Sequence, residues 1–207
     1  MKLSVFATLG TVALFCALPG PALANDSTYT DLDLDKCKTI ASDDMGAIML
    51  CRGYKDYQVH FAEGDLRQSV FYGPLDKKWQ EQGFESFEPF NHVGAKIEWR
   101  LDGSGKPFAA ILRWFLENVG PEGEPTEAST GQVLVVSRVA QREDGLGCVV
   151  GYVDALENPN ANEIARKIAD EEAKDFACGH QEAAWHGKRG DKASEPTHVF
   201  PDGFPQQ

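Results

Sequence analysis

The chain has 207 residues, and its 32 acidic side chains outnumber its 20 basic ones, for a formal net charge of −12 at pH 7. A charge of this sign argues against nucleic acid and anionic lipid as partners, because both are polyanions. The length is typical of a single domain with enough residues to bury a hydrophobic core.

The first 24 residues have the pattern of a secretory signal peptide. Lys2 precedes an apolar run from Leu3 to Leu18, and Ala22-Leu23-Ala24 matches a small-x-small cleavage site. The apolar run is roughly 16 residues, short of the about 20 that a membrane span needs, so a cleaved peptide is favoured over an anchor. We therefore expect cleavage after Ala24, a periplasmic or secreted location, and no integral membrane segment in the mature chain.

Four cysteines remain once Cys16 leaves with the signal peptide. An even number in an exported chain predicts disulfides, with three possible pairings. We favour Cys37–Cys51 and Cys148–Cys178, because each pair is local and the two pairs lie far apart in the sequence. A four-cysteine metal site is the alternative, and it is disfavoured because no C-x-x-C spacing is present.

The first half of the mature chain predicts short strands joined by turns. Residues 57–63 alternate between apolar and polar side chains and predict a strand, with residues 67–73 as its hairpin partner. Residues 31–35, DLDLD, predict an edge strand rather than a calcium site, because no turn glycine accompanies the acids. Residues 47–52, AIMLCR, are a short apolar run, and residues 75–82 have the length of one or two helical turns.

The centre of the chain predicts a β-hairpin. Residues 95–102 alternate strictly, and residues 107–117 return as a longer and more apolar strand. The candidate binding residues on this hairpin are Trp99, Arg100, Arg113 and Trp114. Tryptophan and arginine are favoured anchors of protein interfaces. The alternative is that the tryptophans fill the core and the charges pair across strands.

A second hairpin is predicted over residues 132–142 and 148–155. The loop that precedes it, residues 118–131, is polar and longer than most connections, so it is either a functional loop or a mobile one.

Residues 157–179, ENPNANEIARKIADEEAKDFACG, predict a long amphipathic helix, because apolar side chains recur every three or four residues along it. Either Asn158 or Asn160 would cap its N-terminus, and Glu163 would complete a capping box with Asn160. The asparagines also raise the possibility of a metal site. However, the spacing lacks the glycine and the glutamate of a calcium-binding EF-hand loop.

Catalytic and cofactor motifs are absent: the sequence has no G-x-S-x-G, H-E-x-x-H, G-x-G-x-x-G or P-loop. We expect no catalytic residue, no metal and no cofactor. The alternative is a hydrolase with an unfamiliar site, in which His60 or His92 would act with a nearby acid. A cleft that joins either histidine to a carboxylate of raised pKa would favour the enzyme. An exposed patch of Trp99 or Trp114 with Arg113 would favour binding.

Three stretches carry a resemblance to known proteins: GDLRQSVFYG, IEWRLDGSGKPFAAILRWF and YVDALENPNANEIARKIADEEAKDFACG. With these stretches and its paired cysteines, the chain resembles small exported proteins of unknown function found in alpha-proteobacterial genomes. The resemblance covers most of the mature chain. It implies a periplasmic or secreted location, and it implies no activity, substrate or catalytic residue.

Together these patterns predict a signal peptide (residues 1–24), one α+β domain (residues 25–179) and an extended or disordered tail (residues 180–207). The predicted domain is an antiparallel sheet of about six strands, with one long C-terminal helix packed on it and two disulfides. The expected function is a non-catalytic binding or envelope-interaction module, of which an inhibitor of an envelope enzyme is one form. Its partner would be a protein or another envelope component.

Overall fold

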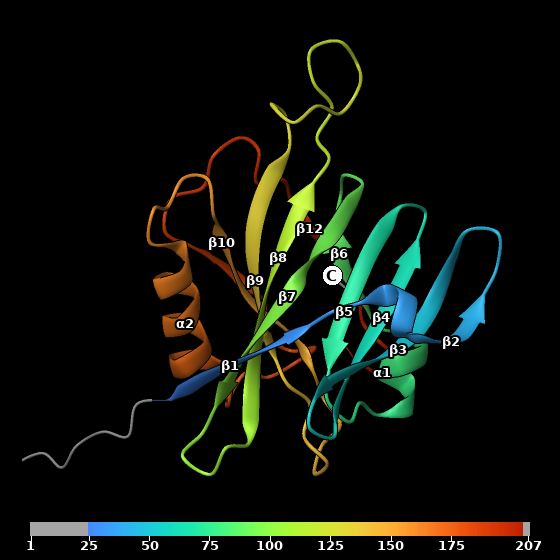
Figure 1. The fold of residues 1–207 in the computed structure, drawn as a ribbon, viewed down its shortest axis with the longest axis vertical. Helices are drawn as coiled ribbons and strands as arrows, with labels where there is room; N and C mark the ends of the chain where they lie inside the picture. Colours follow the sequence, from blue (N-terminus) through green and yellow to red (C-terminus); the bar gives the residue numbers. More distant parts are fainter. Residues whose placement is uncertain (1–24, 205–207) are drawn as a thin grey trace, which may run out of the picture.

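The structure, a computed structural model, describes residues 25–204, so the predicted signal peptide and its cleavage site lie outside the described residues. Within this range the chain forms twelve strands, two α-helices and one short 3-10 helix (Figure 1). The strands are β1 (Asp26–Asp31), β2 (Lys38–Ser42), β3 (Gly46–Tyr54), β4 (Tyr57–Gly64), β5 (Arg67–Tyr72), β6 (Phe84–Phe87), β7 (Asn91–Leu101), β8 (Pro107–Leu116), β9 (Gly131–Arg138), β10 (Cys148–Asp154), β11 (Ala184–His186) and β12 (Pro196–Val199). The helices are η1 (Leu34–Lys36), α1 (Lys77–Gln82) and α2 (Ala161–Glu172).

The described residues are mostly β, and the predicted α+β fold with one sheet and one long C-terminal helix is wrong. The strands form a six-stranded sheet in the order β1-β7-β8-β9-β10-β11, a four-stranded sheet in the order β2-β3-β4-β5, and a two-stranded sheet of β12 and β6. Strand β11 runs parallel to β10, so the six-stranded sheet is not wholly antiparallel. The three predicted hairpins are correct, as β4–β5, β7–β8 and β9–β10.

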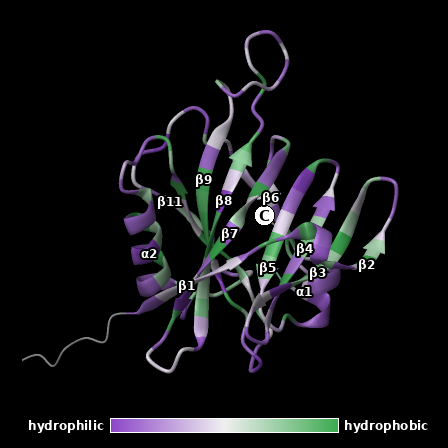
Figure 2. Ribbon diagram, viewed as in Figure 1, coloured by the Kyte–Doolittle hydropathy of each residue, from purple (hydrophilic) through white to green (hydrophobic). Residues whose placement is uncertain are grey.

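Both faces of the six-stranded sheet are covered over most of β8, which explains the continuous apolar run of that strand. Leu112 and Trp114 face one core cluster, which is shared with Val59 and Tyr72 of the four-stranded sheet. Ile111 faces a second core cluster, which includes the buried side of α2. Figure 2 shows hydrophobic residues along the central strands, between more hydrophilic helices and loops.

Helix α2 is shorter than predicted because the chain leaves the helical path after Glu172. Phe176 and Cys178 are both buried in the second core cluster. In a continuing helix these two positions would point about 200° apart, so they could not both face that core. The apolar spacing of this segment therefore describes a helix followed by a packed turn.

The predicted disulfides are confirmed. Cys37, just before β2, bonds to Cys51 of β3, and Cys148 of β10 bonds to Cys178 beyond α2. Two disulfides are typical of proteins that fold outside the cytoplasm. Among the described residues, no helix has both the length and the apolar character to span a membrane.

The segment after residue 179, predicted as an extended or disordered tail, instead contributes β11 and β12 to the body of the protein. The side chains of Asp154, the last residue of β10, and Asn158, in the loop that follows, hold this segment. The Asp154 carboxylate accepts the N–H of Gly190 at 2.9 Å. The Asn158 side chain donates to the carbonyl of Lys188 at 2.7 Å and accepts its N–H at 3.0 Å. Asn158 therefore links the β10–α2 loop to the backbone at Lys188 and does not cap the helix.

The N-terminal cap residue of α2 is Asn160, but its side chain makes no capping hydrogen bond. The backbone N–H of Glu163 donates to the Asn160 carbonyl at 2.9 Å and not to the Asn160 side chain, so the predicted capping box does not form. The predicted position of the helix start is correct. Within residues 25–204, no group of three or more His, Cys, Asp or Glu side chains could hold a metal ion.

Candidate functional site

The two tryptophans predicted as surface anchors lie in the core. Trp99 is 0% exposed and Trp114 is 2% exposed. The Trp99 indole N–H donates to the Thr30 hydroxyl at 2.8 Å, and its ring meets Tyr72 edge-on with centroids 5.5 Å apart. Trp114 packs edge-on against Phe87 at the same separation. Neither tryptophan can anchor a partner at the surface.

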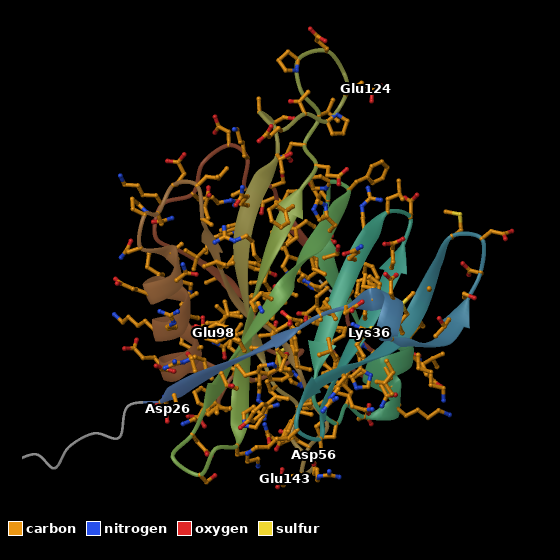
Figure 3. All side chains as sticks on the ribbon, in the orientation of Figure 1. Asp26, Lys36, Asp56, Glu98, Glu124 and Glu143 are labelled. Atoms are coloured by element: carbon orange, nitrogen blue, oxygen red, sulfur yellow. A yellow bond between two sulfur atoms is a disulfide. The ribbon has the colours of Figure 1, made fainter. Side chains whose placement is uncertain are left out.

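The charged residues of the same hairpin are also not gathered into one surface. Arg100 is buried and forms two hydrogen bonds to the Asp170 carboxylate, at 2.9 and 2.7 Å. Together with the pair between Glu98 and Arg166, it fastens α2 to β7; Glu98 lies between β1 and α2 in Figure 3. Arg113 is partly buried elsewhere on the sheet. The four candidate binding residues therefore do not form one site.

The two histidines of the hydrolase alternative lie apart from any catalytic arrangement. His60 is partly buried, its Nε2 is 2.9 Å from the Gly73 carbonyl oxygen, and burial lowers its pKa, which keeps it neutral at neutral pH. His92 is exposed, lies 3.0 Å from the Glu117 carboxylate and stacks on Phe115. No serine hydroxyl or buried carboxylate is hydrogen bonded to either ring in the described part of the chain.

Glu85 of β6 is a buried acid that no sequence pattern singles out. Its carboxylate accepts the N–H of Val149 at 2.8 Å, where the pairing of β10 with β9 shifts register. Burial raises the pKa of Glu85 to about 8, and the nearby charge of Glu182 acts in the same direction. Because its hydrogen-bond partner is a backbone group and it joins neither His60 nor His92, Glu85 has a structural role.

A concave surface lies on the outer face of the four-stranded sheet, beside α1. Two adjoining hollows of about 350 and 330 Å³ share much of their lining. We call this surface the α1 groove; the residues that line its floor and its helical wall include Ile40, Ile48, Leu50, His60, Ala62, Gln80 and Glu81. Here β3 departs from the usual alternation, since its outward side chains are apolar where a solvated sheet face is ordinarily polar.

Helix α1 covers only one side of this face. Trp79 anchors the helix against Phe71 of β5, with ring centroids 5.9 Å apart. The part of the face over β2 and β3 has no such cover, and Ile40 remains 55% exposed and Ile48 36% exposed. Met45 at the tip of the β2–β3 hairpin is 63% exposed. Figure 2 shows the hydrophobic stretch on this hairpin.

Strand β2 forms an open edge next to the α1 groove. It is the outermost strand of its sheet, and all five of its residues are exposed. Its pairing with β3 shifts register between Thr39 and Ala41, which marks a bulge at Ile40. A bulge re-aims the side chain that it carries. Ile40 thus lies in the groove, while the outer edge of β2 presents backbone groups that no strand of the described chain pairs with.

The end of the α1 groove near the hairpin tip is acidic. The charged residues of the first hollow are Asp43, Glu63 and Glu81, and no Lys, Arg or His lines it. Glu81 has a cationic partner in Lys77, at 3.5 Å. Asp43 accepts two backbone N–H groups of its own turn, and Glu63 accepts from the Gln68 amide. The groove therefore combines an apolar floor with uncompensated negative charge.

The sequence holds one signal for this groove. The AIMLCR run of β3 has four consecutive apolar residues, so both faces of that strand are apolar, although only the face with Met49 and Cys51 packs in the core. Comparison of the chain with protein-family models, with curated proteins and with solved structures finds no match.

Proposed function

We propose that this protein is a non-catalytic binding module that holds an extended segment of a partner protein in the α1 groove. The observation that carries the proposal is the uncovered apolar strip of Ile40 and Ile48 beside the open edge of β2. An extended peptide can add to such an edge through backbone hydrogen bonds, and its alternate side chains then enter the neighbouring hollows.

The charge of the groove defines the partner segment further. Asp43 and Glu63 lie at one end with no cation opposite them in the described residues. A segment that alternates apolar residues with Lys or Arg would satisfy both the floor and this acidic end. The overall charge of −12 would also speed the approach of a cationic segment.

The proposal is tested with synthetic peptides and purified mature protein. One peptide alternates isoleucine or valine with lysine, a second has glutamate in place of lysine, and a third is the first with N-methylated backbone amides. We expect the lysine peptide to bind with a micromolar Kd, and the other two to bind at least roughly 10-fold more weakly. The methylated peptide tests strand addition without any change to the protein.

Protein variants test whether the lysine peptide binds in the α1 groove. Ile48→Asp introduces a charge on the groove floor and should weaken binding about 10-fold or more. Leu156→Asp is the matched control, because Leu156 is 45% exposed and lies away from the groove, whereas Ile48 is 36% exposed. Equal affinity of both variants for the lysine peptide would reject the groove as the site. Turnover in a broad hydrolase screen that disappears in His60→Ala or His92→Ala would replace the proposal with the enzyme alternative.

The proposed setting is the periplasm or the external medium, after removal of the signal peptide. The two disulfides and the resemblance to small exported alpha-proteobacterial proteins support this location. Intact-mass spectrometry of the exported protein should give a chain that begins at Asn25 and contains no free thiol. A chain that retains residues 1–24 would contradict the proposed cleavage after Ala24.

A further inference from the structure

A further hollow, of about 320 Å³ and separate from the two of the α1 groove, lies on the six-stranded sheet beyond the start of α2. It occupies the face of the sheet that α2 covers elsewhere, and Asn162 of the first helical turn forms part of its rim. Gly94 contributes no side chain, which leaves space above Phe115. The hollow is separate from the α1 groove, because the two share no lining residue.

Arg113 of β8 lines this hollow and lacks an acidic partner. Its only side-chain hydrogen bond in the described residues goes to the Gln132 amide oxygen, at 3.0 Å. The other arginines of residues 25–204 that are not exposed each have a carboxylate partner; these are Arg67, Arg100, Arg138 and Arg166. A guanidinium that is partly withdrawn from water without a counter-charge is unfavourable, and an anionic ligand would relieve that cost.

The surroundings of Arg113 favour an anion with an apolar body. Ile111, Leu134 and Phe115 form the apolar part of the wall. The remaining charges of the hollow are already compensated, since Lys96 pairs with Asp31 and Glu98 pairs with Arg166. The guanidinium is therefore the one charge in the hollow with no opposite charge paired to it in the described residues.

We propose that this hollow binds a small carboxylate whose apolar part packs on Phe115 and whose head group pairs with Arg113. Arginine and carboxylate match in geometry and can form two parallel hydrogen bonds. An open hollow of this size suits a ligand of about ten heavy atoms, for which a Kd near 1 mM is expected. The inference stands independently of the α1 groove, because it depends on different residues.

Octanoate is the probe, and octylammonium is its control, with the same number of carbon atoms and the opposite charge. A titration of the mature protein followed by ¹H–¹⁵N NMR should shift the signals of Arg113, Phe115 and Gly94 with octanoate and leave them unchanged with octylammonium. Acetate, which has the head group without the tail, should bind at least roughly 10-fold more weakly than octanoate.

Two variants test separately how much the Arg113 charge and the space beside Gly94 contribute to binding. Arg113→Gln should weaken octanoate binding roughly 10- to 100-fold, the range expected for loss of a charge-assisted hydrogen bond, while the exposed Arg52→Gln should leave it unchanged. Gly94→Val keeps the guanidinium but fills the space with a side chain whose Cβ would lie 3.2 Å from the Arg113 carbonyl oxygen and 3.7 Å from the Phe115 ring, and it should also weaken octanoate binding.

Three results would overturn the inference: no octanoate binding at tens of millimolar, equal binding of octanoate and octylammonium, or unchanged octanoate binding by a folded Arg113→Gln variant. Circular dichroism spectra of each variant establish that it is folded. The lysine peptide provides an independent check, since its affinity for Arg113→Gln should equal its affinity for the unmodified protein.

Discussion

Replacing Glu85 by glutamine removes a buried group that can ionise while keeping its shape and one hydrogen-bond acceptor for Val149. Burial raises the pKa of Glu85 from its ordinary value of 4.5 to about 8. In the unfolded chain the same carboxyl would titrate near 4.5. Between these two pH values the folded state therefore binds one more proton than the unfolded state does.

The sign and size of the effect follow from this difference. Stability falls as pH rises wherever the folded state holds more protons, by 1.36 kcal/mol per pH unit for one proton. From pH 6 to the folded pKa of about 8 the loss is about 2 kcal/mol, and it levels off near about 3 kcal/mol at pH 9. That loss is a large fraction of the stability of an ordinary domain.

Urea unfolding followed by tryptophan fluorescence at pH 6 and pH 9 measures the effect. The free energy of unfolding of the unmodified protein should fall by about 3 kcal/mol between these pH values, and that of Glu85→Gln should change much less. Trp79 and Trp99 are fully buried, so their fluorescence should change when the protein unfolds. Parallel pH profiles for the two proteins would refute the raised pKa of Glu85.

Three further changes should lower stability in urea unfolding at pH 7. The double variant Cys37→Ser/Cys51→Ser opens a disulfide across a sequence separation of 14 and should lose about 3 kcal/mol; an unchanged midpoint would show that the bond does not constrain the unfolded chain. Asp170→Ala leaves Arg100 buried without its carboxylate and should cost about 3–5 kcal/mol, against the alternative that water replaces the carboxylate at little cost. Gly73→Ala forces a side chain onto a residue with φ of +88° and places its Cβ 2.4 Å from a backbone oxygen, so a loss of about 2 kcal/mol or more is expected and a neutral result would contradict this backbone geometry.

The features that local pattern predicts correctly are those that depend on neighbouring residues. The alternation of residues 95–102 predicted β7, and the turn that follows predicted its pairing with β8. The local pairing of Cys37 with Cys51 was correct for the same reason, because β2 and β3 form one hairpin. The contacting residues lie close together in the sequence, and the turn that joins them can be recognised from its amino-acid composition.

The features that it missed depend on contacts between distant parts of the chain. Strand β6 pairs with β12 across more than a hundred residues, and each strand has only four residues. Strands this short have no periodicity of their own, and their extended form is selected by packing in the folded protein. Phe87 is therefore a core residue of a strand, β6, that no local pattern predicts.

The four candidate binding residues do not share one surface, and a strand pattern cannot say which face of the strand will be covered. Trp99 and Trp114 have the residue types of an interface, but a second sheet packs over them. Arg113 stands out in the sequence only as a charge on an apolar strand. The α1 groove required knowledge of how far α1 extends across the four-stranded sheet, which no local pattern contains.

Both proposed sites lie where a sheet extends beyond the helix that covers it. Helix α2 has 12 residues and is about 18 Å long, whereas β8 beneath it has 10 residues and is about 33 Å long. Helix α1 has 6 residues, about 9 Å, against about 30 Å for the 9 residues of β3. Each helix therefore leaves part of the sheet face beneath it uncovered. Polar side chains would be the more stable choice for a sheet surface exposed to water. Ile48 on one face and Phe115 on the other are apolar instead, and the charges beside them, negative in the groove and positive at Arg113, would select opposite kinds of ligand.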